Sequence, residues 1–184
     1  LVTGYSAFDM VRQRTPATLQ LSLAALIFTL APGVPLGVLS AVKRGTIWDY
    51  IGRTFSVFGQ ALPPFWLGLM LMLLFSVQLG WLPTSQRGGV THYIMPAITL
   101  GWLTSAGLMR LVRSAMLEVL DSEYIKFARS KGVSNAGVIW KHALKNAMIP
   151  PLTYAALIFA AFLTGAVVTE SVFAWPGLGR LAVT

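Results

Sequence analysis

The side chains that most often carry out chemistry in proteins are few and scattered in this sequence. The chain has no cysteine and two histidines, and neither His92 nor His142 has a ligand-type residue at metal-binding spacing. No glycine-rich loop ends in Lys followed by Ser or Thr, so the sequence predicts no nucleotide-binding loop. We therefore expect no catalytic residue, no metal site and no cofactor, and we do not expect an enzyme.

The six acidic residues lie outside the centres of the apolar segments. Glu170 stands at the outer edge of the last such segment. Carriers that couple transport to protons or sodium usually place ionisable groups within the membrane. The distribution of carboxylates therefore disfavours a coupled carrier.

Basic residues, in contrast, gather in the stretch EYIKFARSKGVSNAGVIWKHALKNAMIPP, residues 123–151. Apolar residues at three- and four-residue steps predict an amphipathic helix that ends near Gly132. A second short helix, capped by Ser134, is predicted to run towards Asn146. The apolar stripe of the first helix comprises Leu117, Leu120, Tyr124, Phe127 and Ala128, and the second helix includes Ile139 and Ala143.

This basic stretch has two interpretations. It is either a loop whose charge only follows the rule that cytoplasmic loops retain Lys and Arg, or a docking element for a cytoplasmic protein. A loop that contacts only solvent gains nothing from two successive amphipathic helices joined by a tight turn. The pattern therefore favours a docking element.

The elements around this stretch are apolar enough to lie in a membrane. The chain is 55% hydrophobic and 11% charged, and four uncharged runs each reach the length of about 20 residues that a spanning helix needs. The net charge of +8 belongs to connections between these runs, so it favours a lipid bilayer or partner proteins over nucleic acid. We predict an external segment at 1–15, spans at about 16–42, 54–79, 94–112 and 147–169, and a cytoplasmic loop at 113–146.

The basic residues also predict the orientation of the spans. Ten of the fourteen lie in two connections, one with Lys43, Arg44 and Arg53, the other from Arg110 to Lys145. Both connections are therefore predicted to be cytoplasmic, and GWLPTSQRGGVTHY is predicted to be external.

Two further features concern the interior and surface of the spans. Pro32, Pro35, Pro63 and Pro64 remove backbone donors, so we predict kinks or breaks. Such breaks are either ordinary features of membrane helices or the lining of a transport pathway. Small residues four apart in the last span predict close helix packing, within the chain or against another subunit. They are Ala156 with Ala160 and Ala161 with Gly165.

The basic stretch resembles the cytoplasmic coupling loop of permease subunits in binding-protein-dependent ABC importers. Of the general Glu-Ala-Ala and Gly pattern, which falls on Lys126, Phe127, Ala128 and Gly132, only Ala128 and Gly132 match. The later Ile, Leu and Pro fall on His142, Leu144 and Lys145. These departures are typical of the dipeptide, oligopeptide and nickel branch, to which ARSKGVS and HALKNAMIP are similar. RTPATLQLS, GVPLGVLSAVKRG, LPPFWLGLMLMLLFSVQLGWLP and ESVFAWPGLGRL resemble that branch too.

The resemblance implies the all-α transmembrane fold of a type I ABC importer, with the first and last of six spans missing from this chain. It implies a multi-pass subunit of a bacterial or archaeal inner membrane that forms half of an import pathway. The implied partners are a second homologous permease, two cytoplasmic ATPases that hydrolyse ATP, and an external solute-binding protein. The implied ATPase-coupling residues are Tyr124, Lys126, Phe127, Ala128, Arg129, Lys131, Gly132, His142 and Leu144.

The substrate stays open at this point. Di- and oligopeptides fit the branch best, and nickel or glutathione are alternatives within the same importer class. An ion channel, a secondary carrier and a membrane scaffold are alternatives of other classes. The partner permease is expected to be a different protein, with a second copy of this chain as the alternative.

Overall fold

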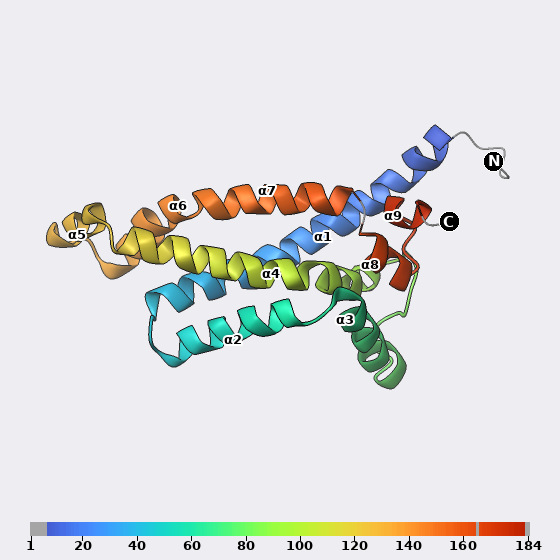
Figure 1. Cartoon of the computed structure of the whole chain (residues 1–184), viewed down its shortest axis with the longest axis horizontal. Coiled ribbons are helices and arrows are strands. Elements are labelled where there is room, and N and C mark those ends of the chain that lie inside the picture. Colours follow the sequence, from blue (N-terminus) through green and yellow to red (C-terminus); the bar gives the residue numbers. More distant parts are fainter. Residues whose placement is uncertain (1–6, 165, 183–184) are drawn as a thin grey trace. The chain divides into compact units, whose positions relative to one another are not determined.

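The computed structural model describes residues 7–164 and 166–182, and these residues form helices joined by short connections (Figure 1). No strand occurs in these two ranges, so the predicted all-α class is confirmed. Two segments, η1 and η2, have the wider turns of a π-helix. In chain order the helices are α1 (Ala7–Val42), α2 (Ile47–Ala61), α3 (Pro64–Leu71), η1 (Met72–Gln78), α4 (Thr91–Leu120), α5 (Glu123–Ser130), η2 (Gly137–Ala143), α6 (Leu144–Ala147), α7 (Ile149–Leu163), α8 (Val167–Val172) and α9 (Leu178–Leu181).

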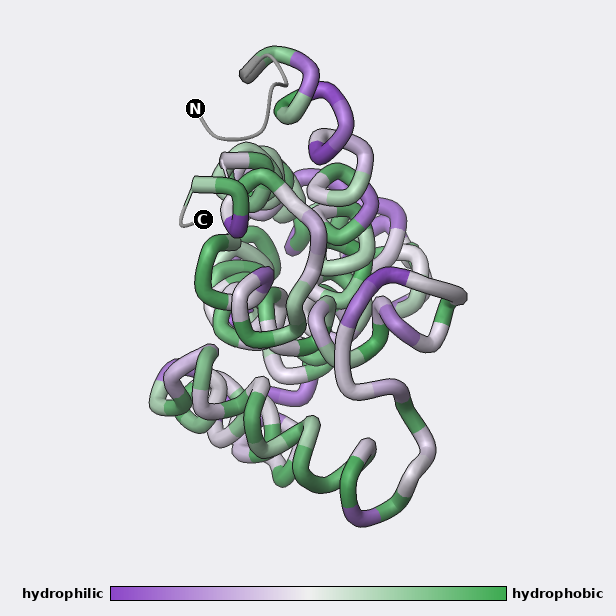
Figure 2. Tube along the Cα trace, turned by 90° about the vertical axis from the view of Figure 1, so that its right-hand side faces the viewer, coloured by the Kyte–Doolittle hydropathy of each residue, from purple (hydrophilic) through white to green (hydrophobic). Residues whose placement is uncertain are grey.

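Among the described residues, two helices, α1 and α4, are long and apolar enough to cross a membrane, and up to four spans result if each of two bent helix pairs counts as one. The bent pairs are α2 with α3 and η1, and η2 and α6 with α7. Figure 2 shows apolar residues along most turns of the long helices and strongly hydrophilic residues in short stretches. The length and composition of the helices therefore agree with the four predicted spans.

The helix boundaries differ from the predicted ones in three places. α1 begins at Ala7, so it includes most of the predicted segment 1–15, whose first six residues lie outside the described ranges. The predicted span 54–79 is interrupted after Ala61. The predicted span 147–169 is also interrupted, because α7 ends at Leu163 and α8 is a separate helix.

Prolines accompany the interruption after Ala61, but other prolines lie within a continuous helix. The chain leaves the helical conformation at Leu62–Pro63, and Pro64 is the first residue of α3, where its missing N–H costs nothing. At Pro32 and Pro35, for which a kink or a break was predicted, α1 shows no break, because its helical residues continue through both. Each of these prolines removes one backbone hydrogen-bond donor, and the neighbouring turns stay helical.

The chain divides into two compact units. The first unit comprises Leu1–Phe28, Leu62–Leu103 and Ile158–Thr184. The second unit comprises Thr29–Ala61 and Thr104–Leu157, and it therefore holds the whole predicted coupling loop.

In the second unit, α1 and α4 approach closely at two glycines. A Cβ atom on Gly33 would lie 3.1 Å from the carbonyl oxygen of Ser105, and one on Gly37 would lie 2.7 Å from the Cβ of Val112. Both distances are shorter than ordinary contacts, so larger residues at these two positions would separate the helices. The core of the unit includes residues of this contact and consists of Val38, Ala41, Leu108, Val112, Ala115, Met116, Ile125, Val138, Ala143 and Ala147.

The first unit is built around Trp175, which is fully buried. Its indole Nε1 donates a hydrogen bond to the carbonyl oxygen of Ala17 over 3.0 Å, and its ring meets the ring of Tyr93 edge-on at 4.8 Å between centroids. Leu21 completes the buried cluster. The segment around α8 and α9 is thereby fixed to the first half of α1.

Candidate functional site

The candidate site is the helix-turn-helix segment from α5 to α6, and it begins with a break that the sequence did not predict. α4 ends at Leu120, and Ser122 has the extended conformation that precedes α5. The Ser122 hydroxyl donates a hydrogen bond to the carbonyl oxygen of Val119 over 2.6 Å, which stabilises the turn. The prediction of one continuous helix from Leu117 to Ala128 is therefore wrong.

This break changes which face of α5 is buried. Ile125 and Ala128 pack into the core of the second unit, whereas Tyr124 is 40% exposed and Phe127 is 60% exposed. The predicted stripe placed Tyr124 and Phe127 on the same face as the apolar residues of α4. That assignment is wrong, because the turn between α4 and α5 changes the direction in which the side chains of α5 point. The α5 helix thus presents two aromatic residues outward.

The end of α5 agrees with the prediction. The N–H of Lys131 donates to the carbonyl oxygen of Phe127 over 3.2 Å, and the N–H of Val133 donates to that of Ala128 over 3.3 Å. Between them, Gly132 has a φ of +79°, a left-handed conformation that glycine adopts without strain. A Cβ atom at Gly132 would have no neighbour within 4 Å, so backbone geometry and not crowding explains the glycine.

The second helix also begins where the sequence predicts. The Ser134 hydroxyl accepts a hydrogen bond from the N–H of Gly137 over 3.2 Å, as expected of a residue that caps a helix. Helical residues continue from Asn135 through η2 and α6 to Ala147. Val138 and Ala143 are buried in the same core as Ile125, so both helices share one hydrophobic support.

A small polar network joins the two helices. The Tyr124 hydroxyl donates to the carbonyl oxygen of His142 over 2.8 Å and accepts from the Asn146 side-chain amide over 2.8 Å. Of the predicted site residues, Tyr124 and His142 are thus brought together, with the backbone of His142 as the partner. Leu144 is half-buried against the core of the unit.

The remaining predicted site residues form the exposed, basic side of the segment. The Nζ of Lys126 lies 2.7 Å from a carboxylate oxygen of Glu123. The Nζ of Lys131 lies 4.4 Å from the centroid of the Phe127 ring, within the range of a cation–π contact. Arg129 is exposed. The segment therefore combines a rigid, buried support with an exposed aromatic and basic surface.

Sequence reasoning missed a buried carboxylate in the same unit as this segment. Asp49 is 1% exposed and accepts a hydrogen bond of 2.6 Å from the Ser40 hydroxyl. The Nε of Arg113 lies 2.8 Å from Asp49 Oδ1, and an Nη of Arg53 lies 2.8 Å from Oδ2. The i, i+4 spacing of Asp49 and Arg53 was a readable signal, but Arg113 comes from another helix. These contacts fasten α2 to α1 and α4.

A second buried carboxyl group, Glu170, was placed by sequence reasoning at the outer edge of a span. The structure buries its side chain completely within the first unit. It accepts a hydrogen bond of 2.9 Å from the Thr18 hydroxyl and one of 2.9 Å from the backbone N–H of Arg180. A Cβ atom on Gly177 would overlap the Glu170 carboxyl group, so the glycine leaves space for it. In the described ranges, no group of three His, Cys, Asp or Glu residues could hold a metal ion.

The helical architecture and the sequence together define a transmembrane component of a transport system. The chain belongs to the family of binding-protein-dependent transport system inner membrane components, whose model matches residues 33–184. It is similar in fold to a chain of the inward-facing MetNI methionine ABC transporter, with a TM-score of 0.75 and 21% identity over 97% of this chain and 82% of that one. A chain of an amino acid ABC transporter crystallised with histidines gives a TM-score of 0.68 and 18% identity over 98% and 82% of the two chains. These likenesses confirm the type I importer fold.

Curated relatives are more similar in sequence. The chain is 44% identical to the di/tripeptide transport system permease protein DppB of Pseudomonas aeruginosa, over 90% of this chain and 57% of that protein. It is 43% identical to the glutathione transport system permease protein GsiC of Salmonella typhi, over 100% of this chain and 60% of that protein. The GsiC protein of Escherichia coli K12 is 42% identical over the same shares. The chain thus spans somewhat more than half the length of these relatives.

Proposed function

We propose that this chain is part of a permease subunit that forms half of the pathway for ATP-driven import of di- and oligopeptides. The similarity to a di/tripeptide permease over 90% of the chain supports this substrate class. The family supports a location in the inner membrane. The pathway itself would form between this subunit and a second, homologous permease, and the exposed Ala156, Ala160 and Ala161 on α7 offer a surface for such packing.

The observation that carries the proposal is the outward aromatic surface of the segment from α5 to α6. Phe127 and Trp140 are 60% and 62% exposed, although both belong to helices whose opposite sides are buried in one core. Exposed aromatic side chains on a rigid support are typical of interface residues. We propose that this surface docks onto one of two cytoplasmic ATPases and that an external solute-binding protein delivers the substrate.

Docking of this kind gives a physical route from ATP hydrolysis to transport. A rigid helix-turn-helix moves as a body, because its two helices share the buried residues Ile125 and Val138 and the Tyr124 network. A partner that binds this body differently in two nucleotide states can shift the permease between two conformations. The chain itself would contribute no catalytic group.

Glutathione is the second candidate substrate. The observation in its favour is the 43% identity to a glutathione permease over the whole of this chain. Glutathione and a dipeptide both carry an amino group, an amide and a carboxylate, so one pathway chemistry would suit both.

The test is reconstitution of the complete subunit in lipid vesicles with its candidate partner permease, ATPases and solute-binding protein. We expect ATP-dependent accumulation of a labelled dipeptide, with glutathione as the competing substrate. Phe127→Ala should abolish uptake and co-purification of the ATPase, whereas Phe58→Ala, a matched change at a residue that is 61% exposed on α2, should leave ATPase co-purification intact. Uptake by this subunit alone without ATP would contradict the proposal and favour a channel or carrier.

A further inference from the structure

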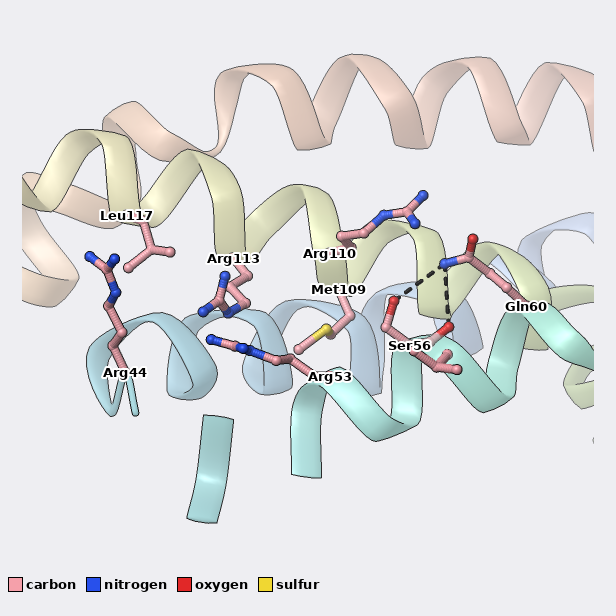
Figure 3. Close-up of a pocket in the computed structure, with 9 residues that line it drawn as sticks. Arg44, Arg53, Ser56, Gln60, Met109, Arg110, Arg113 and Leu117 are labelled. Carbon is pink, nitrogen blue, oxygen red and sulfur yellow. Dashed lines mark hydrogen bonds between the residues drawn. The ribbon is translucent and has the colours of Figure 1, made fainter. Parts of the chain in front are cut away.

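The second unit contains a cavity of about 680 Å³ whose wall is unusually rich in arginine (Figure 3). Arg53 from α2 and Arg113 from α4 meet at one part of the cavity, while Arg110 and Gln60 lie farther along the two helices. The lining residues are Arg44, Arg53, Ser56, Val57, Gln60, Met109, Arg110, Arg113 and Leu117.

The positive charge of this wall exceeds the negative charge that neutralises it. Asp49 is occupied by Arg53 and Arg113 through the hydrogen bonds already described. Arg44 lies 4.0 Å from Asp121, and both of these side chains are mostly exposed, so the pair contributes little. Arg110 has no hydrogen-bond or ion-pair partner in the part of the chain that the structure describes. Four guanidinium groups thus line the cavity, and the one buried carboxylate, Asp49, pairs with two of them, so the cavity is suited to an anion.

Two of the arginines are held in place for such a role. Arg113 is 18% exposed, and its Nε donates to Ser40 over 3.0 Å as well as to Asp49. Arg53 likewise donates from its Nε and one Nη to the two carboxylate oxygens of Asp49, so both guanidinium planes are oriented before any ligand arrives. Guanidinium groups bind phosphate oxygens through paired N–H groups, which makes arginine suited to phosphate more than to a monatomic anion.

The same cavity has an apolar wall. Val57, Met109 and Leu117 line it, and Val57 is 68% exposed. The outer surface of α2 continues this apolar character, because Ile47, Tyr50, Ile51 and Phe58 are all more than 40% exposed. A ligand with both a phosphate group and an apolar body would therefore be complementary to more of the cavity than free phosphate would.

The position along the chain indicates where such a ligand would come from. Arg44 follows the last residue of α1, Val42, in a connection that the distribution of basic residues places on the cytoplasmic side. Anionic lipids of the cytoplasmic leaflet attract basic groups at this depth, and basic pockets between membrane helices bind their headgroups. We propose that the cavity binds the phosphate group of an anionic phospholipid at the end lined by Arg44, Arg53 and Arg113, with Val57 in contact with the acyl region.

The test uses the complete permease complex in detergent, titrated with short-chain phosphatidylglycerol. Native mass spectrometry measures bound lipid, and parallel titrations use short-chain phosphatidylcholine and inorganic phosphate. We expect phosphatidylglycerol to bind about tenfold more tightly than phosphatidylcholine. The reason is that phosphatidylglycerol carries a net negative charge, which compensates the guanidinium groups, whereas phosphatidylcholine has no net charge. Inorganic phosphate alone is expected to bind weakly, because it lacks the apolar contacts.

Arg44→Gln is the decisive variant, because Asp121, the partner of Arg44, lies 4.0 Å away and both side chains are mostly exposed, so little structure is lost. We expect this variant to keep the melting temperature of the lipid-free complex and to weaken phosphatidylglycerol binding about tenfold. Arg110→Gln, at the other end of the cavity, should weaken binding less. The matched control is Arg12→Gln, which removes the same charge from an exposed position on α1 in the other unit and should leave binding unchanged.

Three results would overturn the proposal. They are unchanged phosphatidylglycerol affinity in Arg44→Gln, equal affinity for phosphatidylglycerol and phosphatidylcholine, and an equal loss of affinity in Arg12→Gln. Binding of inorganic phosphate without binding of phosphatidylglycerol would show a soluble anion as the ligand and overturn the lipid assignment.

Discussion

Each of the two units buries one carboxyl group completely, and the two groups are satisfied in different ways. In the second unit, Asp49 receives two guanidinium groups, a hydroxyl and a backbone N–H. In the first unit, the described partners of Glu170 are a hydroxyl and a backbone N–H, and both are neutral. The second unit thus uses ion pairs to satisfy its buried carboxylate, whereas the first uses neutral donors.

The difference follows the distribution of charge between the units. Ten of the fourteen Lys and Arg residues belong to the second unit and four to the first. These ten residues are the ones from which the two cytoplasmic connections were predicted. The basic residues predicted to lie on the cytoplasmic side therefore all belong to the second unit. In the second unit, two arginines, Arg53 and Arg113, lie against the buried carboxylate and stabilise it by charge. In the first unit, the described donors to Glu170 carry no charge, and the carboxyl group relies on hydrogen bonds of fixed geometry.

Among the substitutions that test this comparison, Asp49→Asn is expected to lower the stability of the subunit most. The amide removes the negative charge and leaves the partly buried Arg113 without compensation, so we expect a loss of about 3 kcal/mol in the stability of the folded subunit. Thermal unfolding of the complete complex in detergent would measure it. The control is Asp121→Asn, the same change at an exposed side chain. Equal stability of the two variants would contradict a structural role for Asp49.

A smaller effect is expected from Glu170→Gln. The amide oxygen can still accept one of the two described hydrogen bonds, so we expect a loss of about 1 kcal/mol, below that of Asp49→Asn. The same unfolding measurement, carried out side by side, ranks the two variants. A larger loss for Glu170→Gln would mean that the first unit depends on a charged group after all.

The smallest effect on stability is expected from Gly132→Asn. Asparagine tolerates a positive φ better than residues other than glycine, and a Cβ atom there would meet no described residue within 4 Å beyond its chain neighbours, so we expect a loss of a few tenths of a kcal/mol. Gly132→Leu should cost about 1 kcal/mol more in backbone strain. If the ATPase approaches this turn closely, both variants should reduce ATP-dependent uptake although the subunit stays folded. Normal uptake in Gly132→Leu would contradict a close approach.

The sequence predicts local features of this molecule well and long-range ones poorly. The turn at Gly132, the cap at Ser134 and the interruption at Pro63 depend on residues close in the chain, and the structure agrees with each prediction. The interruption after Leu120 was missed because neither Asp121 nor Ser122 excludes a helix by itself. The shift of the buried face of α5 follows from that one error.

The buried carboxyl groups could not be predicted for a different reason. Glu170 bonds to Thr18, and Arg113 bonds to Asp49, across large separations in the sequence. Neither hydropathy nor spacing reveals such pairs, because a polar residue near the end of an apolar run is equally compatible with an exposed position. At Pro32 and Pro35, local chemistry allows either a kink or a break, and α1 continues through both residues without a break.

The measurement that tests the central proposal most directly is site-directed cross-linking from the outward surface of α5. The chain has no cysteine, so a complete subunit freed of other cysteines can carry a single Phe127→Cys change. In membranes that contain the assembled complex, we expect this cysteine to cross-link to the ATPase, and the matched Phe58→Cys change on α2 to give no such product. Absence of the Phe127 product, with the ATPase still bound to the complex, would contradict docking at this surface.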